Sequence, residues 1–230
     1  MPSIVSHTLV KNGMPFIIAV LEKVEPFVDR QIITMSKQAD VKTYEAIKYY
    51  EYFHKKVVVL LEDVKSPEDL TIERQKQLDM TTEDWVLFLD DDDFWPEKSL
   101  KDIKKLIKRD ENVDAYCFRP FQVINKTYHD GDWWNKWFTK LFRNQPGVHY
   151  ERPWPRDLIF KGSEALYWKT NPRVVKKEIP FFHLSYIKDG SFREKPWAKE
   201  FKYRVGDKVK HINKYKIDIK EIYGHIRKDK

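Results

Sequence analysis

Cysteine is almost absent from the 230-residue sequence, which contains only Cys117. A single cysteine cannot close an intrachain disulfide or form a cysteine-rich zinc site, and this fits a reducing compartment. No stretch approaches 18 consecutive apolar residues, and residues 1–13 lack the basic, apolar and small-residue order of a signal peptide. We therefore expect a cytoplasmic protein without a transmembrane segment; a peripheral position at a membrane surface is the alternative.

Repeats, low-complexity tracts and obvious linkers are also missing, so one continuous domain over residues 1–230 is the simplest interpretation. Disorder of the whole chain is excluded, because hydrophobic residues make up 41% and aromatic residues 15% of the sequence. This composition is sufficient for a packed core.

Positive charge is concentrated toward the C-terminus. The net charge is +7, but residues 199–230 hold 11 Lys/Arg and 5 Asp/Glu, which leaves +1 for the first 198 residues. A basic segment of this kind attracts nucleic acid, an anionic membrane or an acidic glycan. The other interpretation is a solvated helix face, and charge alone does not name the partner.

Two hydrophobic patterns alternate over the first half of the chain. Short apolar runs typical of strands are separated by stretches in which apolar residues repeat at helical spacing. Four strand–helix units in succession predict an α/β fold, with a mostly parallel sheet and helices on its faces. The expected strands are 3–9, 31–35, 56–61, 85–89 and 114–118, and the expected helices are 15–24, 43–53, 67–78 and 96–107.

Aromatic residues and prolines are frequent after residue 118, where the regular alternation fades. Short strands are expected at 138–143 and 179–184, and two final helices at 194–203 and 215–226. Four tryptophans of this half either stack on a sugar ring or a base, or belong to the core: Trp133, Trp134, Trp137 and Trp154.

Four consecutive carboxylates, residues 90–93, follow the apolar run 85–89. In open α/β sheets, ligands bind in the crevice outside the carboxyl ends of the strands. Adjacent carboxylates repel one another, and a hard divalent cation such as Mg²⁺ or Mn²⁺ would relieve that repulsion. The alternative is a solvated acidic turn that caps the next helix, where Asp93 would favour the helix N-terminus.

On these residues the sequence resembles an inverting nucleotide-sugar glycosyltransferase of the GT-A fold, in the large family-2-like group. The acidic run matches the Asp-x-Asp signature of that group. The turn Lys11-Asn12-Gly13 is similar to its Lys-Asn-Glu-like turn after the first strand, and Glu73-Arg74-Gln75 resembles its Ala-Arg-Asn helix. The resemblance covers about residues 1–190 and is strongest in the first 110.

The resemblance implies a Rossmann-like sheet with flanking helices, an irregular acceptor half and C-terminal helices. Residues 1–118 would bind the nucleotide sugar, residues 119–198 would form the acceptor half, and residues 199–230 would be a basic extension. Two departures concern the nucleotide. Met35 occupies the position where the group has an Asp that binds the nucleobase. Of the Gly-Ser-x-Asp turn that follows in the group, this sequence has only the last residue, Asp40. These residues therefore do not identify the nucleotide, and a UDP-sugar donor is expected only as the default of the family.

The resemblance also implies roles for individual residues. Metal would be held by Asp92 and Asp93, with His183 as a third ligand, although a core histidine is an equal interpretation of that residue. Surface ion pairing is likewise an alternative for Lys11 and Arg74. The residues expected to bind the nucleotide sugar are Lys11, Asp40, Arg74, Asp90 and Asp91.

An inverting transfer needs a general base near the acceptor hydroxyl. Glu151 and Asp157 are the candidates in the acceptor half, with Asp130 and Asp132 as further options. The acceptor itself is expected to be a glycan, a lipid-linked saccharide or modified DNA, and the basic extension favours an anionic one.

Two other classes of protein share part of this sequence pattern. A phosphohydrolase of the haloacid-dehalogenase type also has Asp-x-Asp after a strand, but it needs its nucleophile on the first strand and a Thr or Val where this chain has Phe94. A non-catalytic protein that binds nucleic acid or glycan on the same fold is the stronger alternative. Met35 favours it, and the intact acidic run argues against it.

Overall fold

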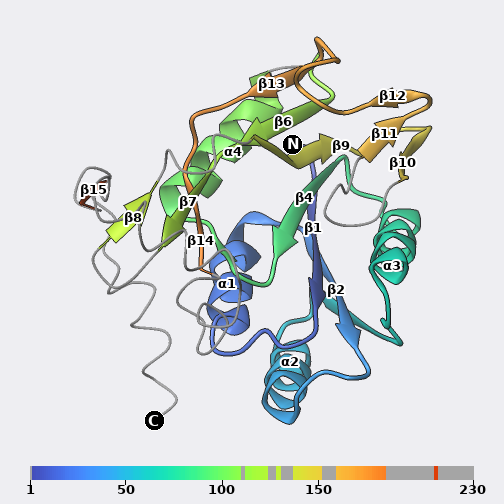
Figure 1. Ribbon diagram of the computed structural model, residues 1–230, viewed down its shortest axis with the longest axis vertical. Helices are drawn as coiled ribbons and strands as arrows, with labels where there is room; N and C mark the ends of the chain where they lie inside the picture. Colours follow the sequence, from blue (N-terminus) through green and yellow to red (C-terminus); the bar gives the residue numbers. More distant parts are fainter. Residues whose placement is uncertain are drawn as a thin grey trace.

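The structure, a computed structural model, describes residues 2–109, 112–123, 128–130, 137–151, 159–184 and 210–211. A seven-stranded sheet with the order β13-β6-β9-β4-β1-β2-β3 forms its centre (Figure 1). All neighbouring pairs are parallel except those of β9, which runs antiparallel to both β4 and β6. The predicted mostly parallel sheet is thus confirmed. Its strands are β1 (Ile4–Val10), β2 (Arg30–Ser36), β3 (Val57–Glu62), β4 (Trp85–Asp90), β6 (Ala115–Phe118), β9 (Phe138–Arg143) and β13 (Val174–Lys176).

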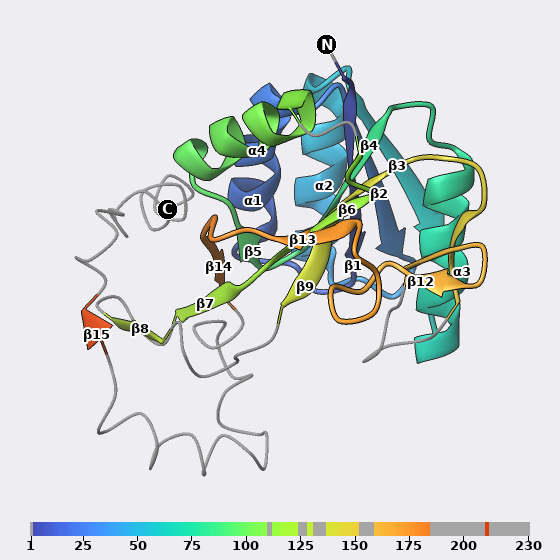
Figure 2. The same cartoon turned by 90° about the horizontal axis from the view of Figure 1, so that it is seen from above.

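Helices cover both faces of this sheet. Figure 2 shows α1, α2 and α4 on one face and α3 on the other. Each face has its own apolar core, one against α1, α2 and α4 and one against α3. Within the described residues, no helix combines the length and the apolar character needed to cross a bilayer. The bounds are α1 (Ile17–Val24), the short 3-10 helix η1 (Glu25–Phe27), α2 (Val41–Phe53), α3 (Pro67–Asp79) and α4 (Glu97–Arg109).

Local sequence explains where two of the helices begin. Between β1 and α1, a Cβ atom on Gly13 would lie only 2.7 Å from side-chain atoms of Val10 and Ile17, so the close approach requires glycine. At the start of α3, Ser66 and Asp69 form a capping box, in which each side chain accepts the backbone N–H of the other residue. Both signals place the helix start within two residues of the expected position.

Smaller sheets complete the second half of the chain. One has the order β15-β8-β7-β14-β5, and the other is β10-β11-β12. The expected strand 138–143 is β9, whereas 179–184 shortens to β14. The expected helices 194–203 and 215–226, and the tryptophans at 133, 134 and 154, lie outside the described residues, while Trp137 packs half-buried against the α3-side core. Bounds are β5 (Asp93–Phe94), β7 (Pro120–Val123), β8 (Tyr128–Asp130), β10 (Val148–Tyr150), β11 (Ile159–Lys161), β12 (Glu164–Ala165), β14 (Phe181–His183) and β15 (Lys210–His211).

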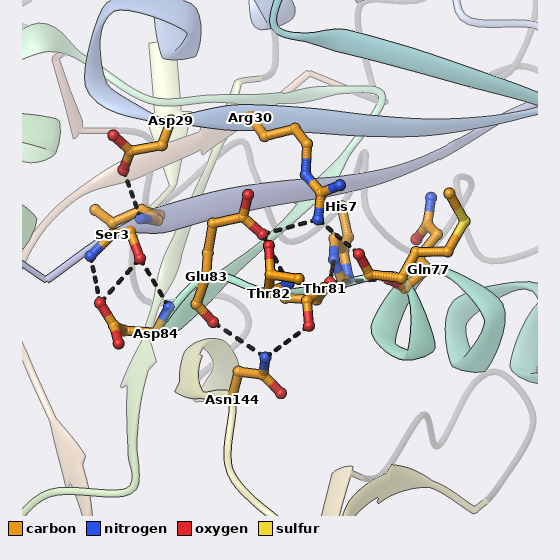
Figure 3. Close-up of polar contacts among 12 residues, drawn as sticks. Ser3, His7, Asp29, Arg30, Gln77, Thr81, Thr82, Glu83, Asp84 and Asn144 are labelled. Carbon is orange, nitrogen blue, oxygen red and sulfur yellow. Dashed lines mark hydrogen bonds and ion pairs between the residues drawn. The ribbon is translucent and has the colours of Figure 1, made fainter.

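Polar side chains tie the amino ends of β1 and β4 together (Figure 3). The backbone N–H and the hydroxyl of Ser3 donate to Asp84 Oδ2 at 2.7 and 2.9 Å. Asn144 donates from Nδ2 to the carbonyls of Thr81 and Glu83, both at 3.0 Å. This network fixes the sheet at the edge opposite the acidic run.

His7 belongs to the same region and is buried on β1, at 3% exposure. Its Nε2 lies 2.8 Å from the Thr81 hydroxyl (Figure 3). Burial, together with the positive charges of Arg30 on β2 and Arg74 on α3, lowers the pKa of His7 to about 3. The folded protein therefore holds this imidazole neutral.

We expect His7→Gln to weaken the acid sensitivity of the fold. The unfolded chain binds the His7 proton near pH 6.5, whereas the folded pKa is about 3. His7 therefore destabilises the fold progressively as the pH falls from 6.5 toward 3, by about 2 kcal/mol between pH 7 and pH 5. Urea unfolding at those two pH values measures the effect, with His149→Gln at a half-exposed position as the control. Equal acid sensitivity of wild type and His7→Gln would contradict the assignment.

Candidate functional site

The acidic run lies at the carboxyl edge of the central sheet. Asp90 is the last residue of β4, residues 91 and 92 form a turn, and Asp93 opens β5. Because β1 and β4 are parallel and Leu9 pairs with Asp90, the carboxyl ends of both strands meet here. This is the position in which open α/β sheets bind ligands.

His183 joins the acidic run from β14. The antiparallel pairing of β5 and β14 places His183 opposite Asp93, and the N–H of Leu184 donates to the Asp92 carbonyl at 2.9 Å. The Nδ1 atom of His183 lies 3.2 Å from Asp92 Oδ1 and 3.1 Å from Asp93 Oδ1. Single ligand atoms of these three residues all fall within 4.8 Å of one another. Such a nitrogen and two carboxylate oxygens form a donor set that fits a divalent cation.

Protonation of His183 depends on the same two carboxylates. Burial alone would lower the pKa of His183, but Asp92 and Asp93 outweigh burial and raise it to about 10. A histidine binds metal only as the neutral imidazole, so the protonated His183 belongs to the metal-free form of the site.

Lys140 is a site residue that the sequence analysis missed. Its Nζ atom donates to Asp90 Oδ2 and to Asp93 Oδ2, both at 2.5 Å. The side chains of Lys140 and Asp93 are only 6% and 1% exposed. Burial lowers the pKa of Lys140, but the charges of Asp90 and Asp93 raise it more, so the lysine is charged. The signal in the sequence was a lysine inside the apolar strand 138–143.

Arg74 approaches Asp90 from α3. It is 6% exposed, its Nη2 lies 3.7 Å from Asp90 Oδ1, and its Cζ lies 3.9 Å from the centroid of the Phe88 ring. Desolvation raises the pKa of Asp90, but Lys140 and Arg74 outweigh it and lower the pKa to about 2. Asp93 differs: burial raises its pKa, and Lys140 offsets only part of that shift. Asp90 is therefore the more firmly ionised of the two.

The structure places the other three expected nucleotide-sugar residues in the loop after β1, at the start of α2 and in the turn between β4 and β5. Lys11 is exposed beyond the end of β1, with Nζ 3.4 Å from Gln38 Oε1. Asp40 is the N-cap of α2 and accepts the N–H of Thr43 at 2.9 Å. Asp91 is half-buried in the turn. Met35, at the position where the family has an Asp, is fully buried in the core on the α1 side.

Neither candidate for the general base, Glu151 or Asp157, has a described contact with the acidic run. Glu151 is exposed and follows β10, where the N–H of Tyr150 donates to Gln75 Oε1 at 2.9 Å. This contact sets Glu151 beside α3, next to the turn of helix that carries Arg74. Asp157 and Asp132 lie outside the described residues, as does the side chain of Asp130. The identity of the base stays a prediction.

Replacing His183 by alanine separates a metal ligand from a core histidine. For a ligand, we expect at least about a tenfold rise in the Mn²⁺ concentration for half-maximal activity, because one of three protein ligands is lost. Titration of activity with Mn²⁺ and thermal unfolding without metal are measured on the same preparation. A large fall in melting temperature with unchanged metal dependence would instead identify a core histidine.

Comparison with known proteins agrees with this geometry. Glycosyl transferase family 2 matches residues 32–166, more than half of the chain. Among curated proteins, none matches the sequence. The mannosyltransferase PcManGT from Pyrobaculum calidifontis, solved with GDP-Man and Mn²⁺, is similar in structure with a TM-score of 0.57 at 15% identity, over 98% of this chain and 70% of that one.

A second solved structure, S. aureus TarS 1-349, has a TM-score of 0.53 at 14% identity and aligns with 80% of this chain. The chain spans 60% of the length of that protein and 36% of a longer TarS chain. At these identities the likeness concerns the fold alone. The GT-A, Rossmann-like sheet expected from the sequence is thereby confirmed.

Proposed function

The chain belongs to glycosyl transferase family 2, and from this we propose that it transfers a sugar from a nucleotide-sugar donor to an acceptor hydroxyl, with inversion and with the help of a divalent metal ion. The observation that carries the proposal is the meeting of Asp92, Asp93 and His183 within 4.8 Å at the carboxyl end of β4. A histidine from the second half of the chain thus completes an acidic site formed by the first.

Mn²⁺ or Mg²⁺ is the proposed cofactor, and the donor set favours Mn²⁺. Mg²⁺ prefers an octahedron of oxygen atoms and keeps much of its water, whereas an imidazole nitrogen stands beside two carboxylates here. The structure of PcManGT, which contains Mn²⁺ and GDP-Man, is consistent with this choice. We infer a nucleotide-sugar donor for this chain as well, with a UDP-sugar as the default and a GDP-sugar as the alternative.

The site residues have distinct proposed roles in the transfer. When bound, the ion stabilises the negative charge that develops on the leaving diphosphate. Asp92, Asp93 and His183 hold it. Asp90, whose side chain is 38% exposed, faces the donor, and the buried Arg74 keeps Asp90 ionised and oriented instead of touching the phosphates itself.

Inversion requires a single displacement. The acceptor oxygen bonds to the anomeric carbon while the bond from that carbon to the diphosphate oxygen breaks, and the nucleoside diphosphate leaves with the electron pair. A carboxylate takes the proton of the acceptor hydroxyl. Glu151 is our first candidate for this base and Asp157 the second.

The acceptor is proposed to be anionic, either a membrane-associated glycan or modified DNA, bound by the acceptor half 119–198 and the basic extension 199–230. Replacing Lys208, Lys210, Lys214 and Lys216 by Gln tests this. If these lysines neutralise phosphates, the log–log salt dependence of duplex DNA binding should flatten by about 0.9 for each phosphate no longer neutralised, while donor hydrolysis stays unchanged. Equally weak binding of wild type and variant to DNA and to anionic vesicles at low salt would contradict an anionic acceptor, and the acceptor would then be neutral.

Thermal unfolding with nucleotides tests the proposed function without knowledge of the acceptor. We expect UDP or GDP to raise the melting temperature strongly only when Mn²⁺ is present, because a ligand of the folded state stabilises it by mass action. Asp92→Asn should lose this shift. A phosphohydrolase or a simple DNA-binding protein would not respond in this way, and the absence of any shift with either nucleotide would contradict the proposal.

A further inference from the structure

Lys140 reaches the acidic site through an irregularity in the sheet. Between β6 and β9, Tyr116 pairs with Leu141 but Cys117 pairs with Thr139, so Lys140 is the extra residue of a bulge. Bulges re-aim side chains and are frequent beside active sites. Here the bulge turns a lysine of β9 toward the end of the neighbouring strand β4.

The ammonium group of Lys140 is enclosed. Its Nζ lies 4.6 Å from the centroid of the Phe88 ring and 5.6 Å from that of Phe181, and the side chain is 6% exposed. Both of its carboxylate partners are 2.5 Å away. Lys140 therefore does not touch a bound donor; it acts on the site through Asp90 and Asp93.

Each carboxylate accepts a hydrogen bond from Lys140 with one oxygen, and its other oxygen faces a different side chain of the site. Asp93 gives Oδ2 to Lys140, while its Oδ1 faces His183 at 3.1 Å. Asp90 likewise gives Oδ2, while its Oδ1 faces Arg74 at 3.7 Å. The lysine thus fixes which oxygen of Asp93 is available to a metal ion.

Lys140 also sets the charge that an incoming cation meets. The acidic cluster, defined as Asp90, Asp92 and Asp93, carries three negative charges when ionised. Lys140 and Arg74 return two positive charges close to these carboxylates. Because Lys140 cancels one unit of the negative charge, the site attracts a free divalent ion less strongly, whereas a diphosphate that binds with the ion brings negative charge and oxygen ligands of its own. Charges a few ångströms apart in a partly buried site interact strongly.

We propose that Lys140 is a positioning residue that acts as a built-in cation: it orients Asp93 and keeps the affinity for free Mn²⁺ low, so that metal binds tightly only together with the donor diphosphate. The inference rests on the proposed metal-dependent transfer. Because coupling between two ligands is reciprocal, Mn²⁺ tightens the nucleotide by the same factor.

Binding of Mn²⁺, followed by electron paramagnetic resonance of the free ion, tests the inference on the full chain with no turnover. We expect Lys140→Gln to bind Mn²⁺ alone about tenfold or more tightly than wild type, and UDP or GDP to enhance its Mn²⁺ affinity less. Lys140→Arg keeps the charge and should resemble wild type. Lys161→Gln is the matched control, since Lys161 pairs with the buried Asp114 outside the site.

Lys140→Met is a second neutral variant, chosen because its stem preserves packing against the two phenylalanine rings. Unchanged or weaker Mn²⁺ affinity in a folded neutral variant would overturn this inference alone. If neither neutral variant folds, the wild type decides: equal Mn²⁺ affinity with and without UDP or GDP overturns the inference. No Mn²⁺ uptake by wild type with either nucleotide would overturn the proposed metal dependence and this inference together.

Discussion

Asp92→Asn is expected to lower sugar transfer by about a hundredfold or more while leaving the melting temperature of the metal-free protein close to that of wild type. The side chain of Asp92 is 13% exposed, and its described ion pair is with His183. Asparagine keeps the size of the side chain but removes the charge that holds a metal ion, and it relieves repulsion among neighbouring carboxylates. Initial rates at saturating Mn²⁺ and thermal unfolding in EDTA measure the two effects.

Unchanged activity of Asp92→Asn at saturating Mn²⁺ would contradict the assignment of Asp92 as a metal ligand. Glu164→Gln, an exposed substitution on β12, controls for the general effect of removing one carboxylate.

Asp93→Ala is expected to destabilise the fold as well as abolish transfer. The Asp93 carboxylate is 1% exposed and lies between Lys140 at 2.5 Å and His183 at 3.1 Å. Removing one partner of a buried ionic network leaves the other charges poorly compensated, and we expect a loss of about 3 kcal/mol or more in the free energy of unfolding. Urea unfolding in EDTA measures it without any contribution from bound metal.

Asp91→Ala is the matched control for Asp93→Ala, because Asp91 is half-buried in the adjoining turn. If the free energy of unfolding of Asp93→Ala lies within about 1 kcal/mol of the wild-type value, the buried charge of Lys140 is compensated without Asp93. The contrast between Asp92 and Asp93 distinguishes a mainly functional carboxylate from one that also holds the fold.

Hydrophobic periodicity was sufficient to predict β1, β2, β3, β4 and β6 of the central sheet, but not the short parallel strand β13. Strands such as β1 and β4 are apolar runs of strand length, and the helix between β1 and β2 repeats its apolar residues at helical spacing. The acidic run was equally visible, because four carboxylates after a buried strand are a local signal. Its place at the sheet edge followed from the general rule for α/β proteins.

Pairing between distant segments was not predictable in the same way. The strand 138–143 was expected, but nothing local shows that it enters the sheet antiparallel between β4 and β6. Lys140 meets Asp93 across 47 positions, and His183 meets Asp93 across 90. Such pairings depend on strand order and on a bulge, which periodicity does not encode, so His183 was inferred by resemblance and Lys140 was missed.

The most direct test of metal-dependent sugar transfer is a screen of UDP- and GDP-sugars for hydrolysis by the purified protein, in Mn²⁺ and in EDTA. Water replaces the acceptor in this assay, so the donor is identified without knowledge of the acceptor. We expect at least one nucleotide sugar to release its nucleoside diphosphate in Mn²⁺, EDTA to slow this release about tenfold or more, and Asp92→Asn to abolish it. Release that is equal in Mn²⁺ and EDTA, or no release from any nucleotide sugar by the folded protein, would contradict metal-dependent transfer.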